Sequence, residues 1–127
     1  MLHQVAQPVE DRARARDFYR DVVGLPLLGE FDPPGLTFFD LGGGTRMLLE
    51  GPGTGATVLY LGVDDIDAEF ARLRAAGVSM EGEPHRIHTH DGTLGQPAGT
   101  EEWMCFFRDT EGNLVGLCER RGSSTSR

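Results

Sequence analysis

Apolar and polar positions follow the same order twice along this chain. Each copy opens with a strand-like stretch, over residues 2–9 and then 57–63. An acidic N-cap residue comes next, Asp11 or Asp65, and apolar side chains then recur at helical spacing until Gly24 or Gly77. A shift of 54 residues superimposes Val9–Asp11 on Val63–Asp65. An internal repeat of this kind predicts two copies of one structural unit, with a cleft between the halves.

Further strand patterns follow each predicted helix. They cover residues 25–31, 36–41 and 46–50 in the first half and 78–83, 101–108 and 114–119 in the second. Turn signals separate them at 32–35, 42–44 and 109–113. Residues 84–99 are rich in glycine and histidine and show neither a strand nor a helix pattern. This segment is either a binding loop or a solvated insertion.

The two copies predict an α+β fold made of two βαβββ modules. Because each helix covers one face of its sheet, the other faces would meet around a cavity, in an open, U-shaped, eight-stranded mixed-sheet barrel with the helices outside. We expect a single domain over residues 1–121. It comprises a first module (2–50), a linker (51–56) and a second module (57–120), and a disordered tail follows over 122–127.

Composition excludes several classes of function. The formal net charge of −8 argues against a nucleic-acid partner. All 12 basic residues are arginine, so chemistry that uses a lysine nucleophile is excluded. The chain has no apolar run of 18 residues and no signal-like N-terminus, which predicts a cytoplasmic protein without a membrane partner. Cys105 and Cys118 lie in apolar strand patterns and are expected to be buried, reduced thiols.

Three stretches resemble the vicinal oxygen chelate superfamily, which includes glyoxalases, bleomycin-resistance proteins and dioxygenases. Residues 5–24 look like its opening strand and the helix that ends in FYxxxLG. Residues 61–76 look like the second opening strand and helix. Residues 107–117, FRDTEGNLVGL, are similar to its closing FxDPDGNxxEL, with Thr110 and Glu111 in place of Pro and Asp.

The resemblance also implies where a metal would bind. Metal-dependent members carry one ligand on each of four strands, and the corresponding positions here hold Gln4, Leu48, Val58 and Gly116. Only Gln4 has a side-chain donor, so we expect no metal and no cofactor at the usual site.

Other residues offer an alternative metal site. Glu50 would face inward two residues after Leu48, and His85, His88 and His90 form a cluster in the long segment. Strand alternation points His3 away from the cavity, but a slip of one residue would bring it inward. The other interpretation of the three clustered histidines is a solvated loop.

The resemblance implies that Gln4 and the residue before the closing turn, Arg108, face the cavity, and strand alternation counted from such positions predicts which other side chains line it. The expected ligand-binding residues are Gln4, Arg46, Leu48, Val58, Tyr60, Met104, Phe106 and Gly116. Glu50 and Glu102 are candidates for general acid–base catalysis. Each of them would alternatively form an ion pair with Arg46 or Arg108 at the mouth of the barrel.

Together these patterns predict a metal-independent protein that binds a small organic molecule in the cavity and either sequesters it or acts on it slowly. The alternative is a divalent-metal-dependent lyase, isomerase or dioxygenase with a rearranged site. We expect a homodimer. Whether the dimer exchanges modules is left open.

Overall fold

The computed structural model describes residues 1–51 and 55–122, which form one nine-stranded sheet and the helices that cover it. The strands are β1 (Leu2–Pro8), β2 (Leu27–Phe31), β3 (Leu36–Gly42), β4 (Thr45–Glu50), β5 (Val58–Gly62), β6 (Ser79–Met80), β7 (His85–Thr89), β8 (Glu101–Arg108) and β9 (Leu114–Arg121). The helices are α1 (Arg12–Asp17), the π-helical segment η1 (Phe18–Val23) and α2 (Ile66–Ala75).

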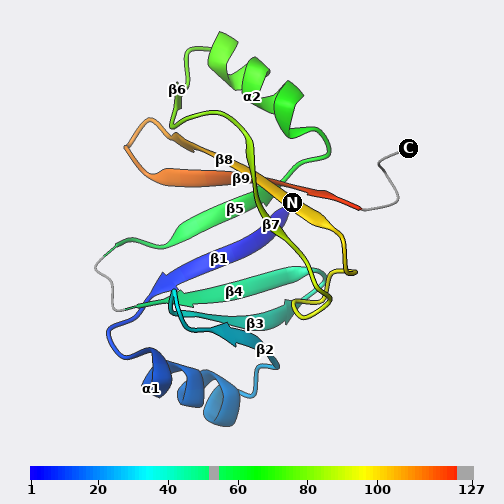
Figure 1. Ribbon diagram of the computed structural model, residues 1–127. Helices are drawn as coiled ribbons and strands as arrows, with labels where there is room; N and C mark the ends of the chain where they lie inside the picture. Colours follow the sequence, from blue (N-terminus) through cyan, green and yellow to red (C-terminus); the bar gives the residue numbers. More distant parts are fainter. Residues whose placement is uncertain (52–54, 123–127) are drawn as a thin grey trace.

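The sheet repeats one connection in its two halves (Figure 1). The strand order is β2-β3-β4-β1-β5-β9-β8-β6, and β7 also pairs with β8. The opening strand of each half lies parallel to the last strand of that half, as β1 does to β4 and β5 to β9. The two opening strands are antiparallel neighbours at the centre. The expected α+β fold, with an open mixed sheet and a helix in each half, is therefore confirmed.

The predicted helix caps are present in both halves. The side chain of Asp11 accepts a hydrogen bond from the backbone N–H of Arg14, and Asp65 does the same for Ala68. Both helices are followed by a glycine in the left-handed region, Gly24 at φ 86° and Gly77 at φ 87°. The first helix differs from the expected single element because it widens into η1 at Phe18.

Apolar side chains form three clusters, two outside the sheet and one inside. Beneath α1 the outer cluster is centred on Phe39, Met47 and Leu49. Beneath α2 it is centred on Ile66, Cys105 and Leu117, with Trp103 and Phe107 packed against it. The inner cluster contains Ala6, Phe38, Leu48, Tyr60, Leu94, Met104 and Cys118. Neighbours along a strand lie on opposite faces, as strand alternation predicts.

The predicted number of strands was wrong by one. The segment 84–99 contains β7, which pairs with residues 101–104 of β8. Because most of β7 is exposed, it has no alternating apolar pattern to reveal it in the sequence. The strand expected over 78–83 is reduced to β6, which pairs with Phe107 and Arg108 farther along the same edge of β8.

Two predictions of chain organisation fall partly outside the described residues. Residues 52–54 of the expected linker and 123–127 of the expected tail are not described. The division of residues 1–121 into two modules of a single domain stays a prediction.

Candidate functional site

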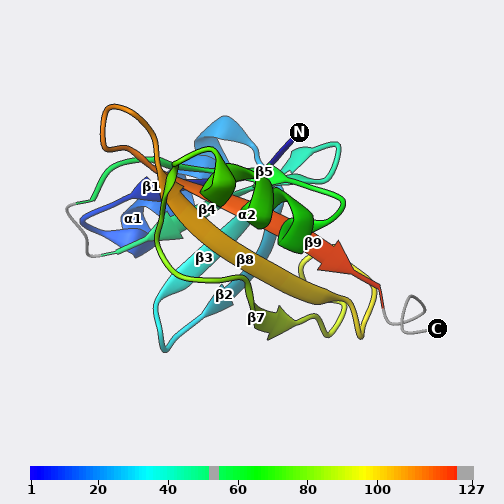
Figure 2. The same ribbon diagram turned by 90° about the horizontal axis from the view of Figure 1, so that it is seen from above.

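The inner faces of the two halves enclose a cavity of about 480 Å³. The residues that line it are Gln4, Phe31, Pro33, Pro34, Leu36, Phe38, Arg46, Leu48, Tyr60, Ile87, His88, Leu94, Glu102, Met104 and Phe106. The turn between β2 and β3 and strand β7, which both contribute to this lining, lie on the same side of the molecule (Figure 2). Its walls are mainly apolar and a few polar groups converge within it, which is the usual form of a small-molecule site.

Glu102 is the centre of the polar part of the cavity. Its side chain is 1% exposed. Its Oε1 atom lies 3.0 Å from Nη1 of Arg46, 2.9 Å from Nε2 of His90 and 3.3 Å from Nε of Arg120. Its Oε2 atom accepts a weaker hydrogen bond from the thiol of Cys118, at 3.5 Å. The paired strands β8 and β9 bring this group together, because Glu102 and Arg120 are partners in their register.

The surroundings of Glu102 keep it ionised. Burial by itself would raise the pKa of the carboxyl group, but Arg46, His90 and Arg120 outweigh burial and lower the pKa to about 2. A carboxylate with so low a proton affinity is a weak general base near neutral pH. Of the two interpretations of Glu102, the geometry favours the ion pair. Its partners are Arg46 and Arg120, whereas Arg108 lies 3.7 Å from Glu81.

Arg46 is fixed in place on several sides and still has an unused donor. It is 6% exposed, its Nε donates to Oε1 of Gln4, and its guanidinium carbon lies 5.3 Å from the centre of the Phe38 ring. Its Nη1 forms the 3.0 Å ion pair with Glu102. Among the described residues this buried atom makes no hydrogen bond of good geometry.

His90 is a neutral partner of Glu102. Burial lowers the pKa of the imidazole, and the hydrogen bond to Glu102 only partly opposes this effect. The ring of His88 packs edge-on against His90, with the ring centres 4.8 Å apart. Nδ1 of His90 is buried and has no hydrogen-bond partner within the described part of the chain.

Tyr60 and Phe106 cover Gly116. Their rings meet edge to face with centres 5.8 Å apart. A Cβ atom added at Gly116 would lie 2.7 Å from the Tyr60 ring and 3.1 Å from the Phe106 ring. Burial raises the pKa of the Tyr60 hydroxyl to about 12, with a further contribution from the charge of Glu50. The hydroxyl is therefore a neutral hydrogen-bonding group at physiological pH.

Most of the predicted cavity residues lie at the cavity. Gln4, Arg46, Leu48, Tyr60, Met104, Phe106 and Glu102 line it. Val58 packs against the inner apolar cluster. Glu50 is exposed and lines a separate surface groove with Pro8 and Gly35.

Sequence reasoning missed several residues of the site. Arg120 follows Gly116 and Cys118 at spacings of two, so the same alternation that placed those residues also indicated it. Phe38 is the partner of Leu48 in the register of β3 and β4. Strand alternation could therefore have predicted Phe38 as a cavity residue as well. The pairing of His90 with Glu102 had no local signal, because it depends on a strand that the pattern did not reveal.

The family model "Glyoxalase/Bleomycin resistance protein/Dioxygenase superfamily" matches residues 1–117. This chain belongs to that superfamily. The resemblance found in the sequence is thereby confirmed.

Similar proteins agree with the family assignment. YraH of Bacillus subtilis, an uncharacterized protein, is 26% identical over 91% of this chain and 95% of its own length. A superfamily member from Vibrio splendidus has a TM-score of 0.71 at 18% identity, covering 94% of this chain and 99% of that one. Methylmalonyl-CoA epimerase from Mycobacterium tuberculosis has a TM-score of 0.69 at 21% identity, covering 99% of this chain and 91% of that one. At these identities the two structures support the fold alone.

The superfamily's usual metal positions are poorly suited to a metal in this member. Leu48, Val58 and Gly116 have no side-chain donor, and the amide oxygen of Gln4 accepts a hydrogen bond from Arg46. The rings of Tyr60 and Phe106 fill the space into which a longer side chain at 116 would extend. These residues do not fit a divalent cation.

The alternative ligands are not gathered in one place. Glu50 faces a different groove, and Nδ1 of His85 lies 3.1 Å from the backbone oxygen of Glu83. The register of β1 and β5 shifts between Leu2 and Gln4, and the imidazole of His3 lies where a Cβ of Gly62 would be. Within residues 1–51 and 55–122, no group of three or more His, Cys, Asp or Glu side chains is placed to hold a metal ion.

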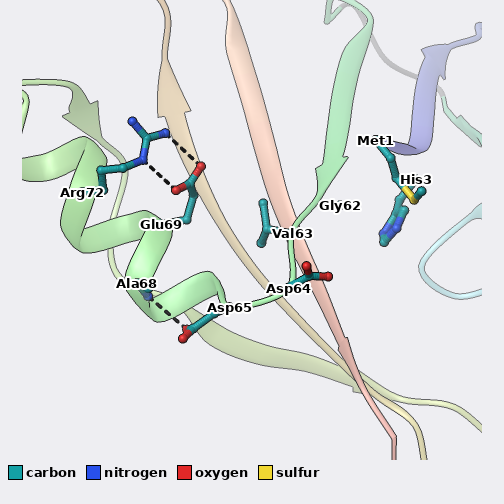
Figure 3. Close-up of a pocket in the computed structure, with 9 residues that line it drawn as sticks. All are labelled: Met1, His3, Gly62, Val63, Asp64, Asp65, Ala68, Glu69 and Arg72. Carbon is teal, nitrogen blue, oxygen red and sulfur yellow. Dashed lines mark hydrogen bonds and ion pairs between the residues drawn. The ribbon is translucent and has the colours of Figure 1, made fainter.

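A second pocket of the protein lies beside the start of α2 (Figure 3). It has a volume of about 580 Å³ and is lined in part by Met1, His3 and Gly62. Several of its polar groups bond to one another: Asp65 caps α2, and Glu69 and Arg72 form an ion pair at 2.8 Å. The inner cavity, with its apolar walls and buried charges, is the better candidate site.

Proposed function

We propose that this superfamily member binds a small organic molecule in the inner cavity without the metal site that is usual in the family. The observation that carries the proposal is a cavity of about 480 Å³ in a chain where three of the four positions for metal ligands, Leu48, Val58 and Gly116, have no side-chain donor. Leu48 lines the cavity directly, and Tyr60 and Phe106 cover Gly116.

Binding rather than catalysis is the function that the charged residues support. Glu102 has a pKa of about 2 and is engaged by two arginines, so its role is to hold Arg46 in place. Glu50, the second predicted catalytic residue, is exposed outside the cavity. We therefore propose sequestration of a ligand, and a slow reaction on it is the less supported form of the same hypothesis.

We further propose that the protein is a cytoplasmic homodimer. The exposed apolar side chains of Phe18 (50%), Val22 (73%) and Leu59 (45%) support association, because large apolar groups at a surface favour burial against a partner. Cys105 and Cys118 are buried and unpaired, as suits a reducing compartment. None of the described helices is long and apolar enough to cross a membrane. Light scattering coupled to size exclusion should give twice the mass of one chain.

The cavity is tested by filling it. Leu48→Phe places a larger side chain in the cavity, and Leu41→Phe makes the same change at an exposed position. Binding of a neutral aromatic probe, 2-naphthamide, followed by protein NMR, should be weakened at least fivefold by the first change and unaltered by the second. Equal affinity of the two variants for the probe would mean that the binding site lies outside the inner cavity.

The proposal that the protein works without a metal is tested by elemental analysis of protein purified without an affinity tag. We expect Ni, Zn, Fe and Mn far below one ion per chain, and a melting temperature that EDTA leaves unchanged. A stoichiometric metal whose removal abolishes an activity would instead establish the metal-dependent alternative.

A further inference from the structure

We propose that the ligand of the inner cavity is an organic monocarboxylate with an aromatic body, and that Arg46 binds its carboxylate. This inference rests on the proposed function and specifies the class of ligand.

The first argument is the unused donor of Arg46. Arg46 is more than nine-tenths buried and lines the cavity. Its Nη1 lies 3.0 Å from Oε1 of Glu102 in an ion pair, but among the described residues this atom makes no hydrogen bond of good geometry. A buried donor whose hydrogen-bonding capacity is not fully used is unfavourable, and a bound acceptor would relieve that cost. Gln4 and the Phe38 ring already fix the orientation of the group. A planar fork held in this way suits two parallel hydrogen bonds to a carboxylate.

The second argument is the balance of charge. Within the buried cluster, the single carboxylate of Glu102 faces two guanidinium groups, Arg46 and Arg120, and His90 is neutral. One positive charge is therefore in excess. The other carboxylate near Arg46 is Asp40, its partner in the register of β3 and β4. Asp40 is only partly buried, and its Oδ1 accepts a hydrogen bond from the backbone of Gly42.

On the cavity side, the charge of Arg46 is only partly compensated, because Glu102, which also lines the cavity, is shared with Arg120. Asp40 lines a separate pocket of about 140 Å³ that Arg46 and Arg120 also border, and it is absent from the lining of the inner cavity. Charge in a poorly solvated site is weakly screened, so a buried cation without a full counter-charge favours an anion over a neutral or cationic ligand.

The third argument concerns the body of the ligand. Two pairs of aromatic side chains line the walls, Phe31 with Phe38 and Tyr60 with Phe106, each with ring centres 5.8 Å apart in edge-to-face geometry. Aromatic rings pack favourably against such edges and faces. The volume of about 480 Å³ lies within the usual range for small-molecule sites. One ring system with a short acidic chain is therefore the class of ligand that suits both the walls and the charged end.

The experiment compares matched acids and amides on the unmodified protein. The pairs are benzoate with benzamide, 2-naphthoate with 2-naphthamide, and 4-phenylbutanoate with 4-phenylbutanamide, measured by calorimetry and by NMR of the arginine Nε–H groups. We expect the acid of at least one pair to bind ten or more times tighter than its amide, and the Arg46 signal to shift with the acid.

Two variants and a control assign the preference to Arg46. Arg46→Gln should reduce the ratio of acid to amide affinity to near one, and Arg46→Lys, which keeps the charge without the fork, should give an intermediate ratio. Arg72→Gln removes one positive charge at an exposed ion pair and should leave the ratio unchanged. If Arg46→Gln does not fold, the ratios of acid to amide affinity of the unmodified protein and of Arg46→Lys still test the inference.

The outcomes separate this inference from the proposed function. Amides that bind in the cavity as tightly as their acids would overturn the carboxylate inference and leave a binding cavity. A preference for 2-naphthylmethylamine would overturn it as well. If neither acids nor amides bind, the proposed function fails together with the inference.

Discussion

At the scale of single residues, the site depends on a carboxylate that holds other groups in position. Glu102 presents one oxygen to Arg46, His90 and Arg120, and these contacts keep it charged despite complete burial. Breaking a buried ion pair by removing one partner is costly, because the other charge remains buried. The same carboxylate therefore supports both the stability of the fold and the orientation of Arg46.

We predict that Glu102→Gln lowers the free energy of unfolding by about 3 kcal/mol at pH 7. Because the folded-state pKa of about 2 is below the ordinary value near 4.5, the ionised group stabilises the fold above about pH 5. This contribution is lost as the pH falls towards 2, where Glu102 becomes protonated. Urea denaturation at several pH values should show the difference between the two proteins narrowing from pH 5 downward. A difference independent of pH would contradict the assignment, and Glu69→Gln, at an exposed pair, should change little.

Gly116 gives a second prediction at this scale. Gly116→Ala should destabilise the protein by about 1–3 kcal/mol, because the new methyl group would overlap the Tyr60 ring. Gly55→Ala is the matched control, since a Cβ there meets no atom within 4 Å. Denaturant midpoints of the two variants measure the difference. Equal midpoints would mean that the Tyr60 ring can move aside without cost.

At the scale of elements, the two halves use the same device to begin a helix. Asp11 and Asp65 stand 54 residues apart and each accepts from the backbone three residues later. The helices that follow are not equivalent, because the first widens into η1 and the second stays α-helical to Ala75. The cap is therefore repeated more closely than the helix that follows it.

We predict that Asp11→Ala and Asp65→Ala each lower the free energy of unfolding by about 1 kcal/mol, the usual contribution of an N-cap. Asp64→Ala changes an exposed neighbour of the second cap and should have a smaller effect. Thermal melts monitored by circular dichroism compare the three variants. If Asp64→Ala and Asp65→Ala were equivalent, the cap would not be the source of the loss.

The sequence was informative where a face of an element is buried. Alternation along β1, β4, β5 and β8 predicted which side chains point into the cavity, because burial on one face imposes a period of two. It failed for β7, whose side chains are mainly exposed. His90 was missed as a partner of Glu102 for the same reason. For the ion pair of Glu102 the sequence offered Arg46 or Arg108 as the partner, and the choice of Arg46 needed the three-dimensional register.

At the scale of the whole molecule, the chain buries both of its thiols. Cys105 lies beneath α2 and Cys118 faces the inner cluster. Burial raises the pKa of Cys105 to about 11 and that of Cys118 to about 12, so both are protonated at neutral pH. Their exposure requires opening of opposite faces of the sheet.

We predict that almost no thiol of the native protein reacts with DTNB at pH 8. Both thiols should react once the protein is unfolded in guanidinium chloride. If opening is global, the two thiols should become reactive at the same rate in native conditions. Rapid reaction of one thiol in the native protein would reveal local opening of the face on which it lies.

The contact between Arg46 and Glu102 also has a consequence for the independence of the two halves. Arg46 belongs to the first half and Glu102 to the second, so the buried arginine of the first half has its counter-charge in the second. The first half produced alone would contain a complete βαβββ sequence and still carry Arg46 without Glu102, whereas Glu102 in the second half would keep Arg120. The two halves are therefore complementary rather than equivalent, and we expect the separately expressed first half to fold only when it is mixed with the second.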